Sequence, residues 1–428
     1  MPDVAERWHA TRRELAGRAV AEVARTARDR WRPRRSAVPR TPTDITPDWL
    51  SALFGRPATV TSVEVADEFH GTATRARLAL SGESVPASVF VKTTPTRVIE
   101  RVFHNVYGLG ETEAAFYQQI AQEIPDCTPA VYGARWDAGT GRSAVVIEDL
   151  AARPAGRVRF ADAGVACTAE EAAVTARTLA GVQRRYWASP RFGSDLARFA
   201  PSGSPSMWFG TYSSALVARL PHRYDDIVDA DFRADALLLH TRRDQVAALW
   251  RSLPQSLLHG DTHRGNMAFE DHGAAGPATS RPGAAGPATS RPGAAGPATS
   301  GPGAAGPATA PLGVTLFDWQ VAGQGPAYKD LAYFAATSLA PDVRRATERD
   351  LVADYVDVVR AGGGPDITEA AAWDAYRLLV VTAYTAAAFT AVFSGRLQSD
   401  ETMRAALARA VAAVRDHDSF ARLRAHLT

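Results

Sequence analysis

The sequence predicts an α+β protein with two lobes, an N-terminal antiparallel sheet lobe and a larger helical C-terminal lobe. Short alternating or β-branched runs fill the N-terminal third, at Val60–Val65, Arg75–Leu80 and Val85–Thr93. Beyond Lys329 the apolar pattern is helical almost to the end of the chain. A sheet-rich segment followed by a helix-rich one favours two packed lobes with a cleft between them.

The remaining elements follow from periodicity in the same way. Helices are expected at Ala5–Arg35, Glu111–Glu123, Thr168–Trp187 and Phe232–Ser252. Strands are expected at Ala144–Ile147, Ser256–Leu258, Met267–Glu270 and Val314–Phe317. We therefore divide the chain into an Arg-rich helical extension (1–43), an N-terminal lobe (44–150) and a C-terminal lobe (151–428).

Composition excludes several classes of protein. The 428 residues carry a formal net charge of +2, too mild a balance to predict a nucleic-acid partner. Two cysteines make no disulfide framework, and the N-terminus has no apolar stretch typical of a signal peptide, so we expect a cytoplasmic protein. The longest apolar run, Leu378–Phe393, is short for a membrane span and contains three threonines. It is interpreted as a buried helix.

A low-complexity segment interrupts the C-terminal lobe. The decapeptide GAAGPATSRP begins at Gly273, repeats from Gly283 and recurs with small changes up to residue 311. Gly, Ala, Pro, Ser and Thr at this density cannot bury a core, so the 273–311 segment is predicted to be a tolerated loop insertion.

Two motifs carry oxygen-bearing side chains. LLHGDTHRGNMAF (Leu257–Phe269) places Asp261 and Asn266 in a loop between two expected strands, and VTLFDWQ (Val314–Gln320) ends a strand with Asp318. Phosphoryl transfer needs a carboxylate to accept the proton of the attacking hydroxyl, and Mg²⁺ needs carboxylate and amide oxygens. Asp261 suits the catalytic base, and Asn266 and Asp318 suit the metal.

The position of the repeat supports this interpretation. Once the repeat is removed, the strand after Asn266 and the strand before Asp318 are separated by a hairpin turn of common length. The two strand ends that bear Asn266 and Asp318 would then lie at one end of the hairpin, and the insertion would lie at the other end. The insertion should therefore not disturb the active site.

HGDTHRGN and FDWQ resemble the catalytic loop and metal motif of the aminoglycoside phosphotransferase and choline kinase-like superfamily. ITPDWLSALF (Ile45–Phe54) and Gln320 are most similar to its ecdysteroid kinase-like branch. The resemblance implies a protein kinase-like fold that uses ATP and Mg²⁺. It further implies transfer of the γ-phosphate to a hydroxyl of an aminoglycoside-, choline- or steroid-like acceptor.

A kinase also needs a strand lysine that holds the nucleotide phosphates and a helical glutamate that orients it. Lys92 ends the run SVFVK, and Glu113 shares the inward face of its expected helix with Phe116 and Tyr117. An inward carboxylate requires a partner, and Lys92 is the expected one. Glu111 is the alternative.

Nucleotide contacts are expected at two further places. HGTATRAR offers Gly71, Thr72 and Ala73 as backbone donors for phosphate, although a plain hairpin turn explains this segment equally well. IEDL resembles the hinge between the lobes, where backbone groups near Glu148 and Leu150 would meet the adenine.

Three residues are expected to support the catalytic loop: His259, His263 and Asp330. A zinc site would need a third ligand at suitable spacing, which the sequence does not show. Asp330 resembles the family's structural aspartate and is expected to fix the following helix. The sequence departs from the family pattern at Gln183, where histidine is frequent, and at Trp319.

The sequence does not determine which molecule accepts the phosphate. An acidic run at Asp225, Asp226, Asp229 and Asp231 would favour a cationic acceptor, and Trp208, Phe209 and Tyr212 an apolar one. A catalytically silent nucleotide-binding module is the alternative function, which the intact catalytic positions oppose. A protein kinase is disfavoured because GxGxxG, HRD and APE motifs are absent from the sequence. The sequence predicts no oligomeric state.

Overall fold

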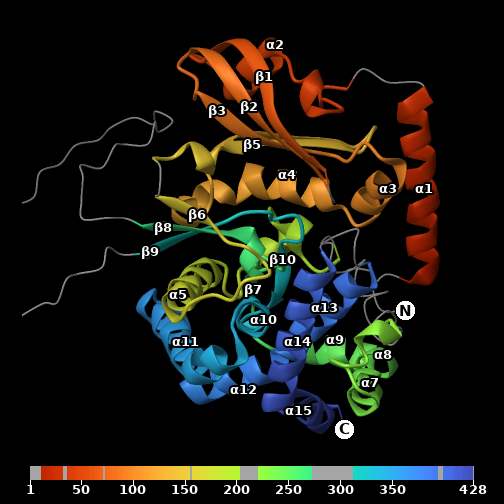
Figure 1. The fold of residues 1–428 in the computed structure, drawn as a ribbon, viewed down its shortest axis with the longest axis vertical. Coiled ribbons are helices and arrows are strands. Elements are labelled where there is room, and N and C mark those ends of the chain that lie inside the picture. Colours follow the sequence, from red (N-terminus) through yellow and green to blue (C-terminus); the bar gives the residue numbers. More distant parts are fainter. Residues whose placement is uncertain are drawn as a thin grey trace, which may run out of the picture.

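The computed structural model describes residues 11–31, 36–70, 73–154, 157–202, 220–271, 312–393 and 399–427. Figure 1 shows an upper lobe built on one sheet and a lower lobe built mainly of helices. The predicted class is thus confirmed: a mixed fold with an antiparallel N-terminal sheet and a larger helical C-terminal lobe. The domain limits at residues 43 and 150 stay predictions.

The N-terminal lobe is a five-stranded antiparallel sheet in the order β1-β2-β3-β5-β4. Its strands are β1 (Thr59–His70), β2 (Thr74–Glu83), β3 (Ser88–Thr93), β4 (Val131–Asp137) and β5 (Arg142–Glu148). Its helices are α1 (Arg12–Trp31), α2 (Pro47–Phe54), α3 (Val98–Val106) and α4 (Leu109–Gln119). Helix α4 packs on β4 and β5 and lies between the sheet and the C-terminal lobe (Figure 1).

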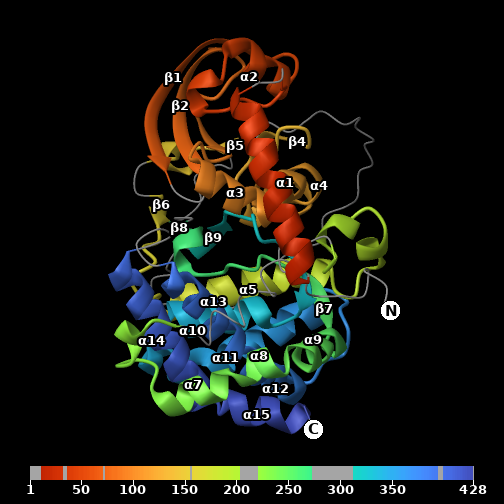
Figure 2. The same cartoon turned by 90° about the vertical axis from the view of Figure 1, so that its right-hand side faces the viewer.

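Helix α1 lies on the outside of this lobe, beside α3 (Figure 2). Its buried Asp29 accepts from Arg142 on β5 (2.6 Å) and pairs with Arg101 on α3 (2.8 Å). Burial by itself raises the pKa of this carboxyl, but the two guanidinium groups outweigh it and leave the pKa lowered. The Arg-rich helix is therefore attached to the sheet lobe by a buried ion pair.

The C-terminal lobe begins with two small sheets. One is β6 (Val158–Phe160), β8 (Met267–Asp271) and β9 (Leu312–Leu316), and the other pairs β7 (Gln255–Leu258) with β10 (Gly323–Pro326). The helices are α5 (Ala169–Arg185), α7 (Ala230–Ala236), α8 (Leu238–Thr241), α9 (Arg243–Ser252), α10 (Lys329–Ser338), α11 (Pro341–Ala361), α12 (Glu369–Leu379), α13 (Val381–Val392), α14 (Asp400–Asp416) and α15 (Ser419–His426).

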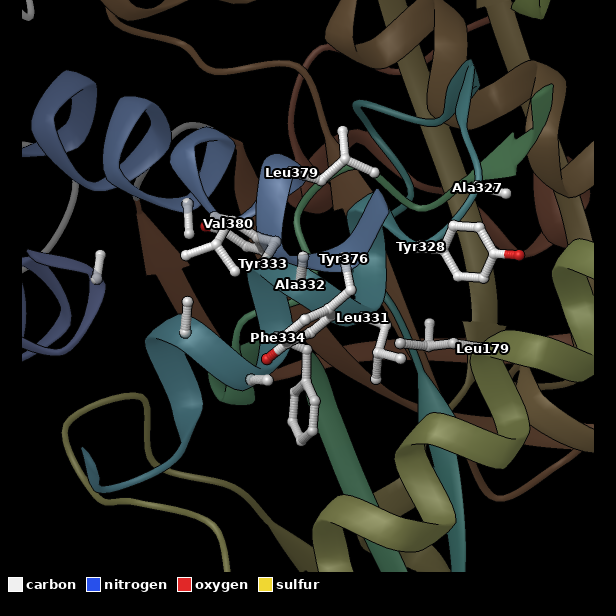
Figure 3. Packing of buried hydrophobic residues seen from close by; sticks show 14 of the residues in the cluster. Leu179, Ala327, Tyr328, Leu331, Ala332, Tyr333, Phe334, Tyr376, Leu379 and Val380 are labelled. Carbon is white, nitrogen blue, oxygen red and sulfur yellow. The ribbon is translucent and has the colours of Figure 1, made fainter. Parts of the chain in front are cut away.

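Helix α10 is the centre of the lobe and packs against α5, α11, α12, α13 and α14. Figure 3 shows its residues Leu331 and Phe334 among Leu179 of α5 and Tyr376 and Leu379 of α12. Every residue from Asp330 to Ser338 is buried. A helix packed over most of its surface is rigid, which suits one that must position functional side chains.

The predicted apolar run, Leu378–Phe393, spans the end of α12 and the whole of α13 and is largely buried. Helices α12 and α13 together, Glu369–Val392, have the length and the mean hydropathy (1.4) of a possible membrane span, but 61% of that window is buried in the protein. Such a pair of helices is typical of a protein core.

The pairing predicted around the repeat is confirmed. β8 and β9 are antiparallel, with Met267 opposite Leu316 and Asp271 opposite Leu312. Asn266 and Asp318 therefore flank one end of this hairpin, and the chain leaves it at the other. The repeat itself, 273–311, lies outside the described residues.

Some parts of the sequence interpretation were wrong, and α3, β6 and β10 were not predicted. Phe232–Ser252 is not one helix, because the chain changes direction near Leu237 and Arg242 to give α7, α8 and α9. The strand β4 was missed because Gly133 interrupts its β pattern. A Cβ at Gly133 would meet the Leu53 side chain at 2.5 Å, so glycine lets α2 pack closely on the sheet.

Candidate functional site

The loop after β7 depends on a glycine. Gly260 has φ +84°, and a Cβ there would lie 2.6 Å from the carbonyl oxygen of Val321. The backbone can therefore turn sharply directly before Asp261. The loop then forms a 3₁₀ turn at Arg264–Asn266, where His263 Nδ1 accepts the Gly265 N–H at 3.0 Å.

The Asp261 carboxylate is held from two sides. Oδ1 accepts from the Tyr333 hydroxyl at 3.0 Å, and Oδ2 accepts from Asn266 Nδ2 at 3.1 Å. His263 Nε2 lies 3.6 Å from Oδ2, consistent with the predicted bracing of the loop. The Asp261 side chain is about 30% exposed, so the carboxylate is fixed in direction and still accessible.

Asp330 fixes the loop from below. Its carboxylate accepts the backbone N–H groups of His259 (2.7 Å) and Gly260 (3.0 Å), and also Gln183 Nε2 at 3.1 Å. Asp330 was expected both to support this loop and to fix the following helix, and its carboxylate accepts from the backbone of the loop that bears Asp261. Burial raises the pKa of this carboxyl.

His259 lies beneath the same loop, where it packs against Trp319 with ring centroids 4.4 Å apart and planes tilted by 48°. Its Nδ1 accepts the Asp261 N–H (3.3 Å), so Nε2 carries the proton and donates to the Phe317 carbonyl at 3.0 Å. Burial lowers the pKa of this imidazole, which agrees with a neutral ring. His259 thus connects the loop of Asp261 with the segment before Asp318.

Lys92 joins Glu113 and Asp318. Its Nζ lies 2.8 Å from Oε2 of Glu113 and 2.6 Å from Oδ1 of Asp318. Glu111, the alternative partner, instead pairs with Arg198. Burial raises the pKa of Glu113 to about 7. Burial acts the same way on Asp318, but Lys92 and Arg75 outweigh it and hold its pKa well below the usual range.

Asp318 is in the left-handed region, with φ +68°. Such a conformation is uncommon for a residue other than glycine and is frequent at functional sites. The next residue, Trp319, is buried and stacks on Phe116 of α4, with centroids 4.0 Å apart and planes 8° from parallel. This contact joins the two lobes directly beside the carboxylate. It also accounts for the large ring in a motif where the family pattern differs.

Arg75 was not identified from the sequence. It is the cross-strand neighbour of Lys92 on β2, and its guanidinium lies 3.0 Å from Oδ2 of Asp318. The sequence signal was present, since Arg75 follows the expected phosphate loop by two positions. Tyr333, which donates to Asp261, was missed because it reads as an ordinary core aromatic.

Three of the five residues that were expected to contact the nucleotide at the phosphate loop and the hinge lie in the described ranges. Ala73 is buried at the start of β2, whereas Gly71 and Thr72 lie outside the described residues. Glu148 ends β5 and pairs with Arg153 at 2.7 Å, and Leu150 is buried. The Glu148 side chain is thus paired with Arg153, and its backbone N–H donates to the Ala130 carbonyl at 2.8 Å.

Asp261 and Asp318 both line one cavity of about 720 Å³. Asn266, Gln320 and Arg75 also line it, and it continues between α9, α10, α13 and α14. The cavity is therefore large enough for the transferred end of a nucleotide and for a small acceptor.

The oxygen atoms present fit a magnesium ion. Asn266 lines the cavity and uses Nδ2 to bind Asp261, and its Oδ1 has no hydrogen-bond partner in the described part of the chain. Asp318 supplies a carboxylate. These same regions contain no group of three His, Cys, Asp or Glu residues suited to a metal. Mg²⁺ bound with a nucleotide needs only one or two protein oxygens, because phosphates and water complete its shell.

The acidic run belongs to the surface. Asp225 pairs with Arg233, Asp226 with Arg404, and Asp229 with Arg415 while also capping α7. None of them lines the cavity, so the run is a solvated helix start. Trp208, Phe209 and Tyr212, the apolar alternative, lie outside the described residues.

Two known families match parts of this sequence. The sequence model of the phosphotransferase enzyme family matches residues 76–276, and that of the ecdysteroid kinase-like family matches residues 305–361. The predicted family resemblance is confirmed. The first match contains Lys92 and Asp261 and the second contains Asp318; the interval between them falls inside the repeat. The two matches support a small-molecule phosphotransferase.

Among solved structures, the chain is similar to a protein from Ralstonia eutropha assigned as an aminoglycoside phosphotransferase. The identity is 14%, the TM-score is 0.43, and the match covers 88% of this chain and 97% of that one. It is also similar to a microcompartment-associated aminopropanol kinase, at 13% identity and a TM-score of 0.38, covering 88% and 98% of the two chains. A search of curated protein sequences gives no match.

Proposed function

We propose that this protein is an ATP-dependent kinase that moves the γ-phosphate to a hydroxyl of a small organic molecule. The observation that carries the proposal is the convergence of Asp261 and Asp318 on one cavity, with Lys92 and Glu113 paired behind Asp318. A silent nucleotide-binding module would not need an accessible carboxylate at Asp261 held by two donors.

In the proposed reaction, Asp261 accepts the hydroxyl proton of the acceptor while the acceptor oxygen forms a bond to the γ-phosphorus. The bond from that phosphorus to the β,γ-bridging oxygen breaks, and ADP leaves with the electron pair. Tyr333 and Asn266 aim the Asp261 carboxylate, so the base needs little reorganisation.

Asp318 and the free amide oxygen of Asn266 would hold Mg²⁺, which supplies positive charge at the phosphates. Lys92 would contact the phosphates while Glu113 keeps its ammonium in place. Arg75 would move from the Asp318 carboxylate toward the nucleotide phosphates, because the phosphates are anionic as well. A cytoplasmic location, where ATP is abundant, stays part of the proposal.

The test is an ADP-release screen of purified protein with Mg²⁺-ATP against amino sugars, amino alcohols, sterols and hydroxy acids. ATP binding is measured in parallel by calorimetry, with and without Mg²⁺. We expect Mg²⁺-dependent ATP binding that Asp318→Asn weakens at least about 10-fold, as loss of a metal-binding carboxylate should. If neither protein binds ATP, the proposal is wrong.

A further inference from the structure

Lysine is rare in this chain, and both lysines lie at the site. Of 48 Lys and Arg residues, only Lys92 and Lys329 are lysines. Lys92 binds Glu113 and Asp318, and Lys329 lines the cavity. An ammonium is a compact point charge, whereas a guanidinium is a broad planar fork. In a chain that otherwise uses arginine, both compact cations thus lie at the site.

Lys329 begins a stripe of cavity-lining residues on α10. Lys329, Tyr333 and Thr337 are four residues apart, so they share one face of the helix, and all three line the cavity. The Tyr333 hydroxyl contacts Asp261. The Cβ atoms of Lys329 and Tyr333 are therefore about 5–6 Å apart. Both side chains start from the same face of α10 and line the cavity that contains the proposed base, Asp261.

Within the described ranges, no carboxylate forms an ion pair with this ammonium. Lys329 is partly buried and makes no side-chain hydrogen bond or ion pair with any residue in the described ranges. The neighbouring Asp330 directs its carboxylate to the backbone of His259 and Gly260. Burial lowers the pKa of Lys329. A desolvated cation of this kind is stabilised by an anion in the cavity.

The charges on the cavity wall also favour an anionic ligand. Among the described lining residues the carboxylates are Asp261 and Asp318, and Asp318 is already bound by two cations. Arg75, Arg243 and Lys329 also line the cavity. The wall formed by α9, α13 and α14 is otherwise apolar or carries hydroxyl groups: Val246, Trp250, Phe389, Thr382, Thr385, Thr390 and Met403. A polycationic amino sugar finds no carboxylates here beyond those at the phosphoryl-transfer end.

We infer that the phosphate acceptor is a hydroxy acid with an apolar body, whose hydroxyl meets Asp261 and whose anionic group pairs with Lys329. This inference rests on the proposed kinase function and specifies its substrate class. The apolar body would lie against α9 and α13, where Trp250 and Phe389 line the cavity.

Three rigid probes that differ at one end test it: 4-(hydroxymethyl)benzoate, 4-(aminomethyl)benzyl alcohol and 1,4-benzenedimethanol. Each presents the same benzylic hydroxyl, and the opposite end is an anion, a cation or neutral. Binding is measured by calorimetry to protein saturated with Mg²⁺ and a non-hydrolysable ATP analogue. We expect the acid to bind at least about 10-fold more tightly than the amine, or about 1.4 kcal/mol. An acid that binds no better than the amine, or does not bind, overturns the inference.

Variants assign the effect to Lys329. Lys329→Met keeps the length of the side chain and removes the charge, so the preference for the acid should be lost, while Lys329→Arg should restore part of it. Arg251→Met, an exposed charge change on α9 away from the cavity, is the matched control. If Lys329→Met keeps the wild-type preference for the acid, Lys329 is not the anion-binding group.

The scarcity of lysine gives a second readout. Reductive methylation with ¹³C-formaldehyde preserves the charge and labels the two lysines, and the Lys329→Met variant assigns their NMR signals. The Lys329 signal should shift with 4-(hydroxymethyl)benzoate and stay unchanged with 1,4-benzenedimethanol; no shift with the acid contradicts the inference. Failure of the kinase proposal looks different, because ATP would then not bind whichever probe is used.

Discussion

Lys92 Nζ lies 2.6 Å from Oδ1 of Asp318, although the two residues come from different lobes and are 226 positions apart in the sequence. Glu113 on α4 shares the same ammonium. Two carboxylates and one lysine thus meet in a buried cluster, with Arg75 as the second cation. Two protein cations thus neutralise the carboxylate that is proposed to bind Mg²⁺.

The Glu113 carboxyl makes stability depend on pH. Its pKa is raised by burial from 4.5 to about 7, so the folded protein binds this proton more tightly than the unfolded chain does. The resulting stabilisation is fully present below about pH 4.5 and is lost as the pH rises through 7. We expect the free energy of unfolding of wild type, relative to Glu113→Gln, to fall over this window. Urea titrations at pH 5, 6, 7 and 8 measure it, and a constant difference would contradict the assignment.

Asp261→Asn should lower turnover at least about 100-fold, because an amide cannot accept the hydroxyl proton. The fold should be kept, since the amide oxygen can still accept from Tyr333. The measurement is kcat for ADP release with the best acceptor, together with the melting temperature. Wild-type turnover in this variant would remove Asp261 from the role of base.

Deletion of Gly273–Ala308 should leave kcat within about 3-fold of wild type. The remaining residues between Asp271 and Leu312 suffice for a hairpin loop of ordinary length. This end of the β8–β9 hairpin is opposite the end that bears Asn266 and Asp318. Steady-state kinetics of the shortened protein is the check, and a large loss of turnover at unchanged stability would assign the repeat a part in the reaction.

Gln183→Leu should destabilise the protein by about 1–3 kcal/mol, the cost of leaving buried polar groups unpaired. Gln183 donates to Asp330 at 3.1 Å and accepts from the Tyr355 hydroxyl. Thr175→Val, another buried site on α5, is a control that removes one hydroxyl bonded within its own helix. Denaturant unfolding of both variants gives the comparison, and an effect no larger than that of Thr175→Val would show that this network is dispensable.

The sequence by itself determined the two-lobe order, the catalytic loop and the place of the insertion. These features depend on local signals: alternation in the strands, a glycine before Asp261, and polar side chains at the ends of two apolar strands. The partner of Lys92 was also predictable, because Glu113 lies on the inward face of its helix and a buried carboxylate needs a cation.

Only the tertiary structure decided which side chains meet across elements. Two contacts join residues far apart in the chain: Arg75 with Asp318, and Tyr333 with Asp261. The fold also places Lys329 on the wall of the same cavity. Arginine, tyrosine and lysine at these positions have ordinary surface or core interpretations in the sequence. Their roles depend on where packing places them, and packing is a property of the whole fold.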